Sequence, residues 1–275
     1  MDWKKELFDK NEKPLDRLVE GYSNTSLFRS IAVIGDSLSS GEFEIWEDKG
    51  AARYYDMYEY SWGQYMAKDA GCTVYNFSKG GMTAKDYEDF ALENGFYDDK
   101  YKSQAYIITL GTNDIGKVVK GEIELGDVSD VDVNDYANNK PTVIGYYAKI
   151  IAKYKLIQPK AKFFLVSRPK EDAGMPEDEL KRKYVTLHDE FARQLENLTK
   201  IFDNCYFMDV RKYGPIYDEE FKRNFYLGGH MNPMGYRLVA LLYETYIDYI
   251  IRHNPEDFKQ VGFIGTAYHN VNAKW

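Results

Sequence analysis

Five short apolar runs constrain the fold of this chain more than any other feature. They are rich in β-branched and aromatic residues, and they read SIAVIG (30–35), CTVYNF (72–77), AYIITL (105–110), AKFFLVS (161–167) and NCYFMDV (204–210). Segments with apolar residues at helical spacing alternate with these runs, at 61–70, 83–94, 143–157, 177–201 and 233–252. Strands that alternate with helices predict a parallel sheet, and strands this apolar are buried on both faces. We therefore expect an α/β fold, in which a central, mainly parallel sheet of about five strands lies between two layers of helices.

The chain of 275 residues is within the range of one α/β domain with long loops. We expect a single domain with an N-terminal extension (1–29), a loop insertion (116–141) and a C-terminal tail (254–275). The insertion is rich in aspartate, and it is a candidate lid or substrate wall above the strand ends, or else a solvated acidic surface or a weak cation site. The tail either wraps the domain or mediates an oligomer contact through Phe258, Phe263 and Tyr268.

Composition excludes several classes of function. A net charge of −8 gives no broad basic surface, so we do not expect a nucleic-acid partner. The chain has no apolar stretch of about 18 residues, so we do not expect a membrane protein. Cys72 and Cys205 lie in separate apolar runs, which favours buried thiols over a disulfide or a metal site. The charged N-terminal segment does not read as a secretory signal, and we expect a cytoplasmic protein.

The residues that follow the strands are the candidates for chemistry, because open parallel sheets bind ligands at the carboxyl ends of their strands. After the first run, Gly35 permits a tight turn that places Ser37 at a helix start, where it either attacks a substrate or caps the helix. After the second run, Gly81 lets a backbone amide approach a substrate closely. After the third, Asn113 offers an amide donor suited to an oxyanion, although Asn also favours turns.

One of four histidines is placed to act as a general base. His188 lies inside a long helical segment, where packing is its expected role, and His253 lies at a helix C-terminus, where a cation is favourable. His269 lies in the tail and has no predicted role. His230 follows two glycines and precedes a helix, so its imidazole can project from a loop onto the same edge of the sheet.

Together these blocks, GDSL (35–38), N-x4-G-x-T (76–83) and G-x-N-D (111–114), with a late loop histidine, resemble the SGNH or GDSL hydrolase family. The resemblance covers about residues 30 to 245 and implies a flavodoxin-like fold. It implies that Ser37 is the nucleophile, that His230 is the base, and that Ser37, Gly81 and Asn113 form the oxyanion hole. It also implies an ester hydrolase that needs no metal or organic cofactor.

The match fails where the family places an aspartate three residues before the histidine. Here that residue is Leu227, and the proline expected directly after the histidine is displaced to position 233. Three alternatives follow: a backbone carbonyl orients His230, an acid from elsewhere does so, or the protein is catalytically dead. The candidate acids are Asp218, Glu219 and Glu220. We expect Asp36 and Asp114 to accept loop N–H bonds rather than to serve as the missing acid.

Aromatic content indicates the substrate. The chain has 25 tyrosines and 4 tryptophans, and aromatic faces stack well on sugar rings. We expect a small acyl group, such as acetyl, on a small-molecule or oligosaccharide substrate, with Trp46 and Trp62 as candidate sugar contacts. The alternatives are a lysophospholipase or thioesterase acting on longer acyl chains, and a non-catalytic carbohydrate-binding or interaction module. The sequence does not predict the oligomeric state.

Overall fold

A computed structural model describes residues 11–19, 23–46, 50 and 52–265 of the chain. At its centre is a parallel sheet of five strands in the order β4-β1-β5-β6-β7. Each strand falls within one of the five apolar runs, and the strands are β1 (Ser30–Ile34), β4 (Thr73–Asn76), β5 (Ala105–Ile108), β6 (Lys162–Val166) and β7 (Cys205–Met208). The predicted α/β class and the number of sheet strands are confirmed.

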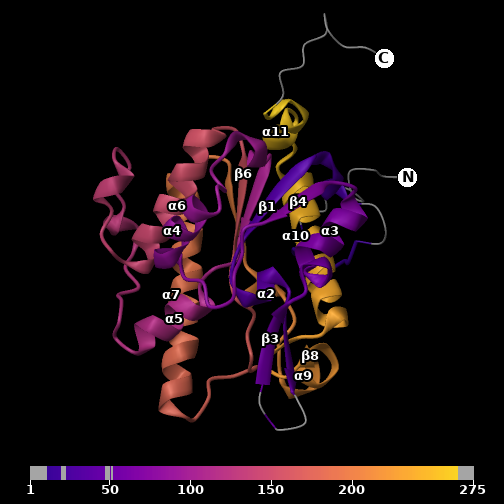
Figure 1. Ribbon diagram of the computed structural model, residues 1–275, viewed down its shortest axis with the longest axis vertical. Helices are drawn as coiled ribbons and strands as arrows, with labels where there is room; N and C mark the ends of the chain where they lie inside the picture. Colours follow the sequence, from indigo (N-terminus) through magenta and orange to yellow (C-terminus); the bar gives the residue numbers. More distant parts are fainter. Residues whose placement is uncertain (1–10, 20–22, 47–49, 51, 266–275) are drawn as a thin grey trace, which may run out of the picture.

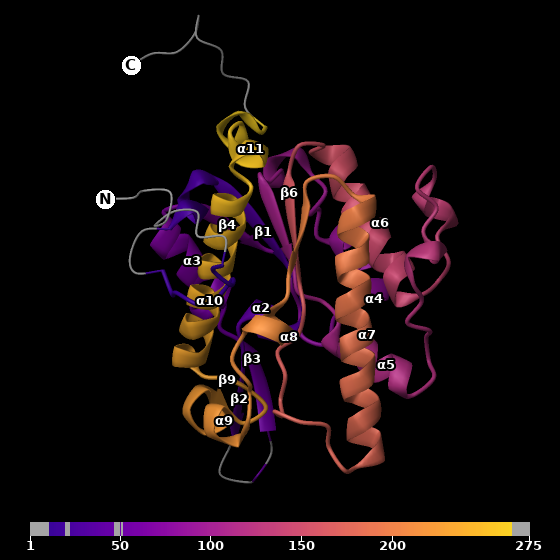
Figure 2. The ribbon, with the colours of Figure 1, turned by 180° about the vertical axis from the view of Figure 1, so that it is seen from behind.

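Helices cover both faces of the sheet (Figures 1 and 2). Alternate residues of β1 point to opposite sides, so Ile31 and Val33 are buried in one core cluster and Ala32 and Ile34 in the other. The first cluster packs against α3 (Trp62–Ala70) and α10 (Pro233–His253), and the second against α4 (Ala84–Glu93), α6 (Val143–Ile157) and α7 (Glu179–Ile201). These five helices match the predicted segments within two residues, and the three-layer architecture is confirmed.

Local sequence determines where α3 begins and ends. The Ser61 hydroxyl accepts a hydrogen bond from the Gln64 N–H, and Gly71 at the other end has a φ of +65°. A hydroxyl can satisfy a free N–H of the first turn, and glycine adopts the left-handed conformation without strain. Ser61 therefore caps the start of α3 and Gly71 its end.

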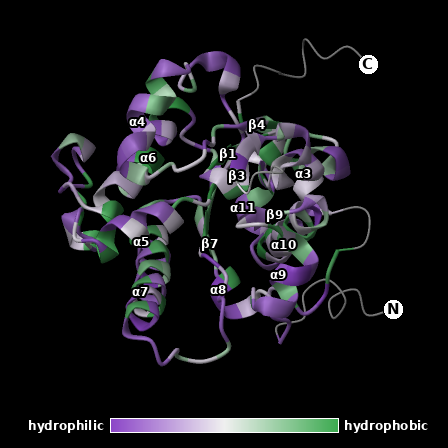
Figure 3. Ribbon diagram, turned by 60° about the horizontal axis from the view of Figure 1, so that its bottom comes forward, coloured by the Kyte–Doolittle hydropathy of each residue, from purple (hydrophilic) through white to green (hydrophobic). Residues whose placement is uncertain are grey.

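The carboxyl ends of the strands form the edge of the sheet that faces the viewer in Figure 3. Because β1 lies between β4 and β5, the connection after β1 leads to one side of the sheet and the connection after β5 to the other. This is the topological switch point, where open α/β sheets bind ligands. The segments that follow β1, β4 and β5 therefore meet at one place.

Several short elements at this edge were not predicted from the sequence. A hairpin of β2 (Glu42–Trp46) and β3 (Ala52–Asp56) projects below the sheet in Figure 1, and a second hairpin pairs β8 (Tyr226–Leu227) with β9 (His230–Met231). The remaining α-helices of the described residues are short. Near this edge are α2 (Ser37–Ser40), α5 (Thr112–Val119), α8 (Val210–Tyr213) and α9 (Glu219–Phe225), whereas α11 (Pro255–Phe258) lies at the opposite end of the molecule (Figure 1).

The 116–141 segment is more ordered than an open loop. Its first residues belong to α5, and two 3-10 turns, Val128–Asp130 and Tyr136–Asn138, pack against α6 (Figure 1). Its aspartates accept local backbone N–H bonds, as Asp127 does from Ser129, and so they stabilise turns. The two turns cover the outer side of the α6 layer rather than the strand ends, so the structure does not support the lid interpretation.

The described parts of both terminal segments pack against the domain. The Asn24 N–H and side-chain amide both donate to Asp248 of α10. In the tail, Phe258 is buried and lies edge-on to Phe28, while Phe263 is exposed. Tyr268 and His269 lie outside the described residues. The tail up to residue 265 therefore packs on the domain. Of the aromatic residues predicted to mediate an oligomer contact, Phe258 is buried and Phe263 lies at the surface.

Candidate active site

A tight turn at Gly35 brings Ser37 to the edge of the sheet. A Cβ at Gly35 would lie 2.3 Å from the hydroxyl oxygens of Ser39 and Thr109, so no larger residue fits there without a shift. The Asp36 carboxylate then accepts a hydrogen bond from the Leu38 N–H at 3.1 Å and caps α2. Ser37 is therefore the first residue of α2, half-buried, beside the free N–H groups of a helix start.

The loop after β4 lies against this turn. The Lys79 N–H donates to the Gly35 carbonyl at 3.3 Å, and the Asn76 amide donates to the Ser39 and Ser40 carbonyls, also at 3.3 Å. Gly81, two residues beyond Lys79, has a φ of +74°, a conformation that glycine adopts readily. Two predicted blocks, GDSL and N-x4-G-x-T, are thus joined by hydrogen bonds.

Asn113 joins the third block to the second. It lies in the first turn of α5, and its side-chain amide donates to the Met82 carbonyl at 3.1 Å. An amide carries two N–H groups, so one remains for a ligand. Within the described part of the chain, the backbone N–H groups of Ser37 and Gly81 donate no hydrogen bond. Three donors are therefore free where the three strand ends meet.

His230 reaches the same edge from the β8–β9 hairpin. Leu227 is its direct partner across the hairpin, and the turn between them contains Gly228 with a φ of +67°. The second strand of this hairpin packs against both α2 and β2. The structure thus brings His230 beside the helix that carries Ser37, although no hydrogen bond joins the two side chains among the described residues.

Two glutamates flank the His230 ring. Glu42 Oε1 lies 3.1 Å from Nε2, and Glu44 Oε2 lies 3.8 Å from Nδ1. Nδ1 is buried and makes no hydrogen bond within the described structure, while Glu44 also accepts a hydrogen bond from the Gly229 N–H. Residues two apart on a strand share a face, so β2 presents both carboxylates to the imidazole.

The acids proposed from the sequence do not lie at His230. The Asp218 carboxylate accepts from the Phe221 N–H at 2.9 Å and caps α9. Glu219 and Glu220 are exposed in the first turn of that helix. Acidic residues are favoured at a helix N-terminus by its free N–H groups and dipole, which explains their position. The sequence analysis missed Glu42 and Glu44, and the one local signal for them is the alternation of acids in GEFEIW (41–46), directly after the serine block.

Burial changes the acidity of three carboxyl groups near Ser37. Burial raises the pKa of Glu42, with smaller contributions from Asp56 and Glu44, while His230 acts in the opposite direction. Burial raises the pKa of Asp36 to about 6 and that of Asp114 to about 7.

Asp36 and Asp114 both hold local backbone. Asp36 caps α2, as described above, and Asp114 accepts from the Ala84 N–H at the start of α4, at 2.9 Å. They therefore do what the sequence predicted of them, since each accepts a loop N–H bond.

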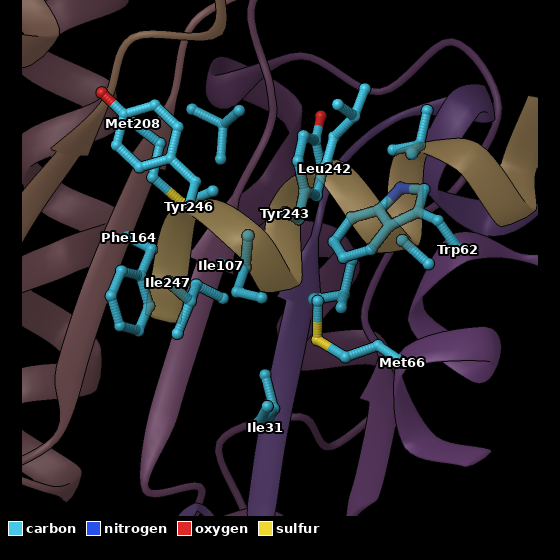
Figure 4. Close-up of a cluster of buried hydrophobic side chains, with 14 of the residues drawn as sticks. Ile31, Trp62, Met66, Ile107, Phe164, Met208, Leu242, Tyr243, Tyr246 and Ile247 are labelled. Atoms are coloured by element: carbon cyan, nitrogen blue, oxygen red, sulfur yellow. The ribbon is translucent and has the colours of Figure 1, made fainter. Parts of the chain in front are cut away.

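The two tryptophans proposed as sugar contacts differ in exposure. Trp62 is 1% exposed and packs edge-on against Tyr243 in the core, so it has no free face for a sugar (Figure 4). Trp46 is 62% exposed and lies on the same face of β2 as the two glutamates. On β3, Tyr54 is the cross-strand partner of Glu44, and its ring lies edge-on to the His230 ring at 5.6 Å. The hairpin thus presents the Tyr54 ring against His230 and a second exposed ring, that of Trp46, on the same face.

A small cavity lies beneath the serine turn. Its volume is about 50 Å³, and Asp36, Leu38 and Ser39 form one wall. Most of its remaining lining is apolar, including Trp62 and Met231. Among the described residues, no group of three or more His, Cys, Asp or Glu side chains could hold a metal ion. None of the described helices is long and apolar enough to cross a membrane.

A family model supports the reading of the sequence blocks. The model for GDSL-like Lipase/Acylhydrolase matches residues 31–242, which include Ser37, Gly81, Asn113 and His230. No curated protein matches the chain significantly in sequence.

Solved structures of similar fold include two carbohydrate esterases. One is a carbohydrate esterase family 2 enzyme with a carbohydrate-binding domain from Corynascus thermopiles (Myceliophthora fergusii), at 15% identity and a TM-score of 0.52, covering 81% of this chain and 66% of that one. Another is a family two carbohydrate esterase from Clostridium thermocellum in complex with cellohexaose, at 16% identity and a TM-score of 0.50, covering 81% of this chain and 64% of that one. This chain thus spans just under two thirds of the length of each.

A further similar structure is that of a putative GDSL-like lipase from Parabacteroides merdae ATCC 43184. It has 17% identity and a TM-score of 0.51, and the alignment covers 79% of this chain and 94% of that one. Sequence identities of 15–17% show that the three proteins share the fold of this chain, and they show no more than that.

Proposed function

The chain belongs to the GDSL-like lipase/acylhydrolase family, a family of ester-hydrolysing enzymes, and from this premise we propose that it is a serine esterase with Ser37 as nucleophile and His230 as base. The observation that carries the proposal is the meeting of Ser37, the free N–H groups at Gly81 and Asn113, and His230 at the switch point of the sheet. Each group supplies one part of an acyl-transfer site.

In the first step the Ser37 Oγ attacks the ester carbonyl carbon, and its proton passes to the His230 ring. The carbonyl oxygen becomes an oxyanion, which the N–H groups of Ser37, Gly81 and Asn113 stabilise, each by about 3 kcal/mol. When the tetrahedral intermediate collapses, the C–O bond to the alcohol breaks and His230 protonates the departing oxygen. The acyl group is then bound to Ser37 as an ester.

In the second step water replaces the alcohol. His230 removes a proton from the water as it attacks the acyl carbon, and the same three N–H groups stabilise the second oxyanion. Collapse of this intermediate releases the carboxylic acid and returns the proton to Ser37. No metal or organic cofactor takes part in either step.

We assign the role of the missing aspartate to Glu42. Its carboxylate lies 3.1 Å from Nε2, whereas that of Glu44 lies 3.8 Å from Nδ1 and already accepts a hydrogen bond from the Gly229 N–H. A carboxylate at one ring nitrogen fixes the tautomer and stabilises the imidazolium. In this assignment Glu42 holds Nε2 of His230, and Nδ1 is the nitrogen that takes the proton of Ser37.

The small cavity beside the serine turn favours a short acyl group. A cavity of about 50 Å³ beside the serine turn holds little more than an acetyl group, and pockets for larger ligands occupy some 300 Å³ or more. The exposed ring of Tyr54 against His230, and that of Trp46 on the same face of the hairpin, suit a sugar on the alcohol side of the ester. Two proteins of similar fold are described as carbohydrate esterases, one of them solved with cellohexaose, and this supports a carbohydrate substrate. The proposed reaction is therefore the removal of acetyl groups from a carbohydrate.

Replacement of the nucleophile tests the mechanism. We expect Ser37→Ala to lower kcat/KM for p-nitrophenyl acetate by about 10³-fold or more, because the acyl-enzyme cannot form. Ser129→Ala, an exposed serine in a distant turn, is the matched control and should retain wild-type turnover. A Ser37→Ala protein that keeps wild-type turnover would overturn the assignment of Ser37 as nucleophile. A wild-type protein with no activity on any ester would favour a non-catalytic binding module.

In the same assay, a series of p-nitrophenyl esters from acetate to decanoate tests the acyl group. We expect kcat/KM to be highest for acetate and to fall with chain length. A rate that rises with chain length would instead favour a lysophospholipase or thioesterase.

A further inference from the structure

A second, larger cavity adjoins the small one beneath the serine turn. Its volume is about 510 Å³, within the usual range for small-molecule sites. It lies between segment 168–176, which follows β6, and the helices α7, α8 and α9, which surround this edge of the molecule in Figures 2 and 3. Arg168 and Pro169 line both cavities, so the larger one begins where the wall of the serine turn ends.

An imidazole without partners lines this cavity. His188 of α7 is only 6% exposed, and neither of its ring nitrogens has a hydrogen-bond partner in the described structure. Burial, with Arg168 and Arg211 nearby, lowers the pKa of His188 to about 3, so the ring is neutral and offers one donor and one acceptor. Both nitrogens are closed to solvent, so a ligand in the cavity reaches them when the His188 ring turns toward it, and it then satisfies polar groups that are otherwise unpaired. Packing alone, the role expected for this residue, does not account for two unpaired nitrogens.

The charges of the cavity wall largely pair with one another. Glu171 accepts from both Arg168 and Lys222, the latter at 3.0 Å. Arg211 pairs with Asp189 and is 7% exposed. The wall therefore offers many hydrogen-bond donors and acceptors, with little net charge to select an ion.

This lining suits a sugar better than an acyl chain. An acyl chain would cover paired ionic groups without hydrogen-bonding to them, which is unfavourable. A sugar ring has hydroxyl groups that both donate and accept, so it can satisfy a neutral imidazole and a mixed ionic wall together. Tyr184, Met175 and Pro176 add apolar surface for the carbon face of such a ring.

We propose that this cavity binds a sugar unit of the substrate remote from the ester, with His188 as a binding residue. The proposal rests on the function proposed above and deepens it, because a substrate that occupies both the serine turn and this cavity must be an oligosaccharide.

The length of the sugar chain is the variable that tests the proposal. We would measure kcat/KM for monoacetylated xylo-, gluco- and manno-oligosaccharides of one to four units. In at least one series, kcat/KM should rise about tenfold or more from the monosaccharide to the trisaccharide, as the cavity becomes occupied. In His188→Ala this ratio should fall to near one. Lys181→Ala, which alters an exposed position of the cavity wall and is not expected to disturb folding, should lower the ratio by at least about twofold.

The matched control is His253→Ala, a histidine at the far end of α10, which should keep the wild-type ratio. The proposal is overturned if no series shows a rise with length, or if both cavity variants keep the wild-type ratio. Calorimetric titration with the unacetylated oligosaccharides measures sugar binding without catalysis. It therefore tests the sugar site even if the esterase proposal fails. Binding that His188→Ala weakens supports the sugar site even in a protein without esterase activity, and the absence of binding in all three series contradicts it.

Discussion

At the scale of single residues, Leu227 is the position where this chain departs from its family. It lies directly across the β8–β9 hairpin from His230, and its side chain is apolar and 42% exposed. The carboxylates that lie at the imidazole come instead from β2, almost two hundred residues earlier. A strand places alternate side chains on one face, so Glu42 and Glu44 reach the ring together. The acid needed by a serine esterase can thus come from another element.

The role of Glu42 can be tested by removing its charge. We expect Glu42→Gln to lower kcat for p-nitrophenyl acetate by about 10²-fold or more with little change in KM, because the imidazolium loses its stabilising carboxylate. Glu42→Asp should recover part of this loss, which a purely structural role would not predict. The measurement is steady-state kinetics, with thermal melting to verify that the variants fold.

Glu44→Gln is the matched control for that experiment. Glu44 accepts from the Gly229 N–H, and a glutamine oxygen can accept the same bond, so we expect a much smaller loss of kcat. If Glu44→Gln is the variant that loses activity and Glu42→Gln is not, the assignment of the two acids is reversed.

At the scale of elements, the β2–β3 hairpin builds much of the candidate site. It carries both glutamates, and it presents Trp46 and Tyr54 on the face that holds His230. On the opposite face, Phe43 is buried and packs edge-on against Tyr60. One face of the hairpin therefore packs on the core, and the other carries the side chains of the site. Because its buried face anchors it, the hairpin keeps regular strand pairing although it lies outside the central sheet.

The exposed rings of this hairpin should determine preference for sugar esters. We expect Trp46→Ala to lower the ratio of kcat/KM for an acetylated sugar to that for ethyl acetate by about fivefold to tenfold, since a stacked ring contributes on the order of 1 kcal/mol. Tyr54→Ala should act in the same direction. Phe263→Ala, which removes an exposed ring in the tail, should leave the ratio unchanged. A ratio unaffected by both hairpin variants would remove these rings from the substrate site.

At the scale of the whole molecule, two buried carboxyl groups under the site link stability to pH. Burial raises the pKa of Asp114 from 3.8 to about 7, so the folded protein holds this proton more tightly than the unfolded chain does. Above the unfolded pKa the unfolded chain releases the proton first, so the free energy of unfolding falls as pH rises towards about 7 and then stays level. Asp36, whose pKa is about 6, acts in the same direction.

Asp114→Asn isolates one of these two contributions. Asparagine keeps an acceptor for the Ala84 N–H and resembles the protonated acid, so the variant should match the wild type only below about pH 4, where the unfolded chain also holds the proton. Between about pH 5 and pH 8, urea titrations should show the variant gaining about 2–3 kcal/mol relative to the wild type, at about 1.4 kcal/mol per pH unit below the folded pKa. Asp99→Asn, at a carboxylate whose side chain is 88% exposed, should show no such gain. An equal pH dependence in both variants would contradict the role of Asp114.

The sheet, the main helices and the sequence blocks of the candidate site follow from local patterns. Five apolar runs and five amphipathic segments were enough to predict the sheet and its two helical layers, because burial on both faces leaves no other arrangement for such strands. Ser61 and Gly71 marked the ends of α3 because caps depend on the chemistry of one residue. The hairpins were missed because a strand of two to five residues, half-exposed, gives little periodicity.

What the sequence by itself determined is the α/β fold and the set of blocks that carry Ser37, Gly81, Asn113 and His230, because these depend on periodicity and on local turn chemistry. Only the tertiary structure decided which acids lie at His230, that Trp62 is core while Trp46 is exposed, and that His188 lines a cavity without a partner. Those facts depend on contacts between residues far apart in the chain, and such contacts leave no pattern in the neighbourhood of either residue.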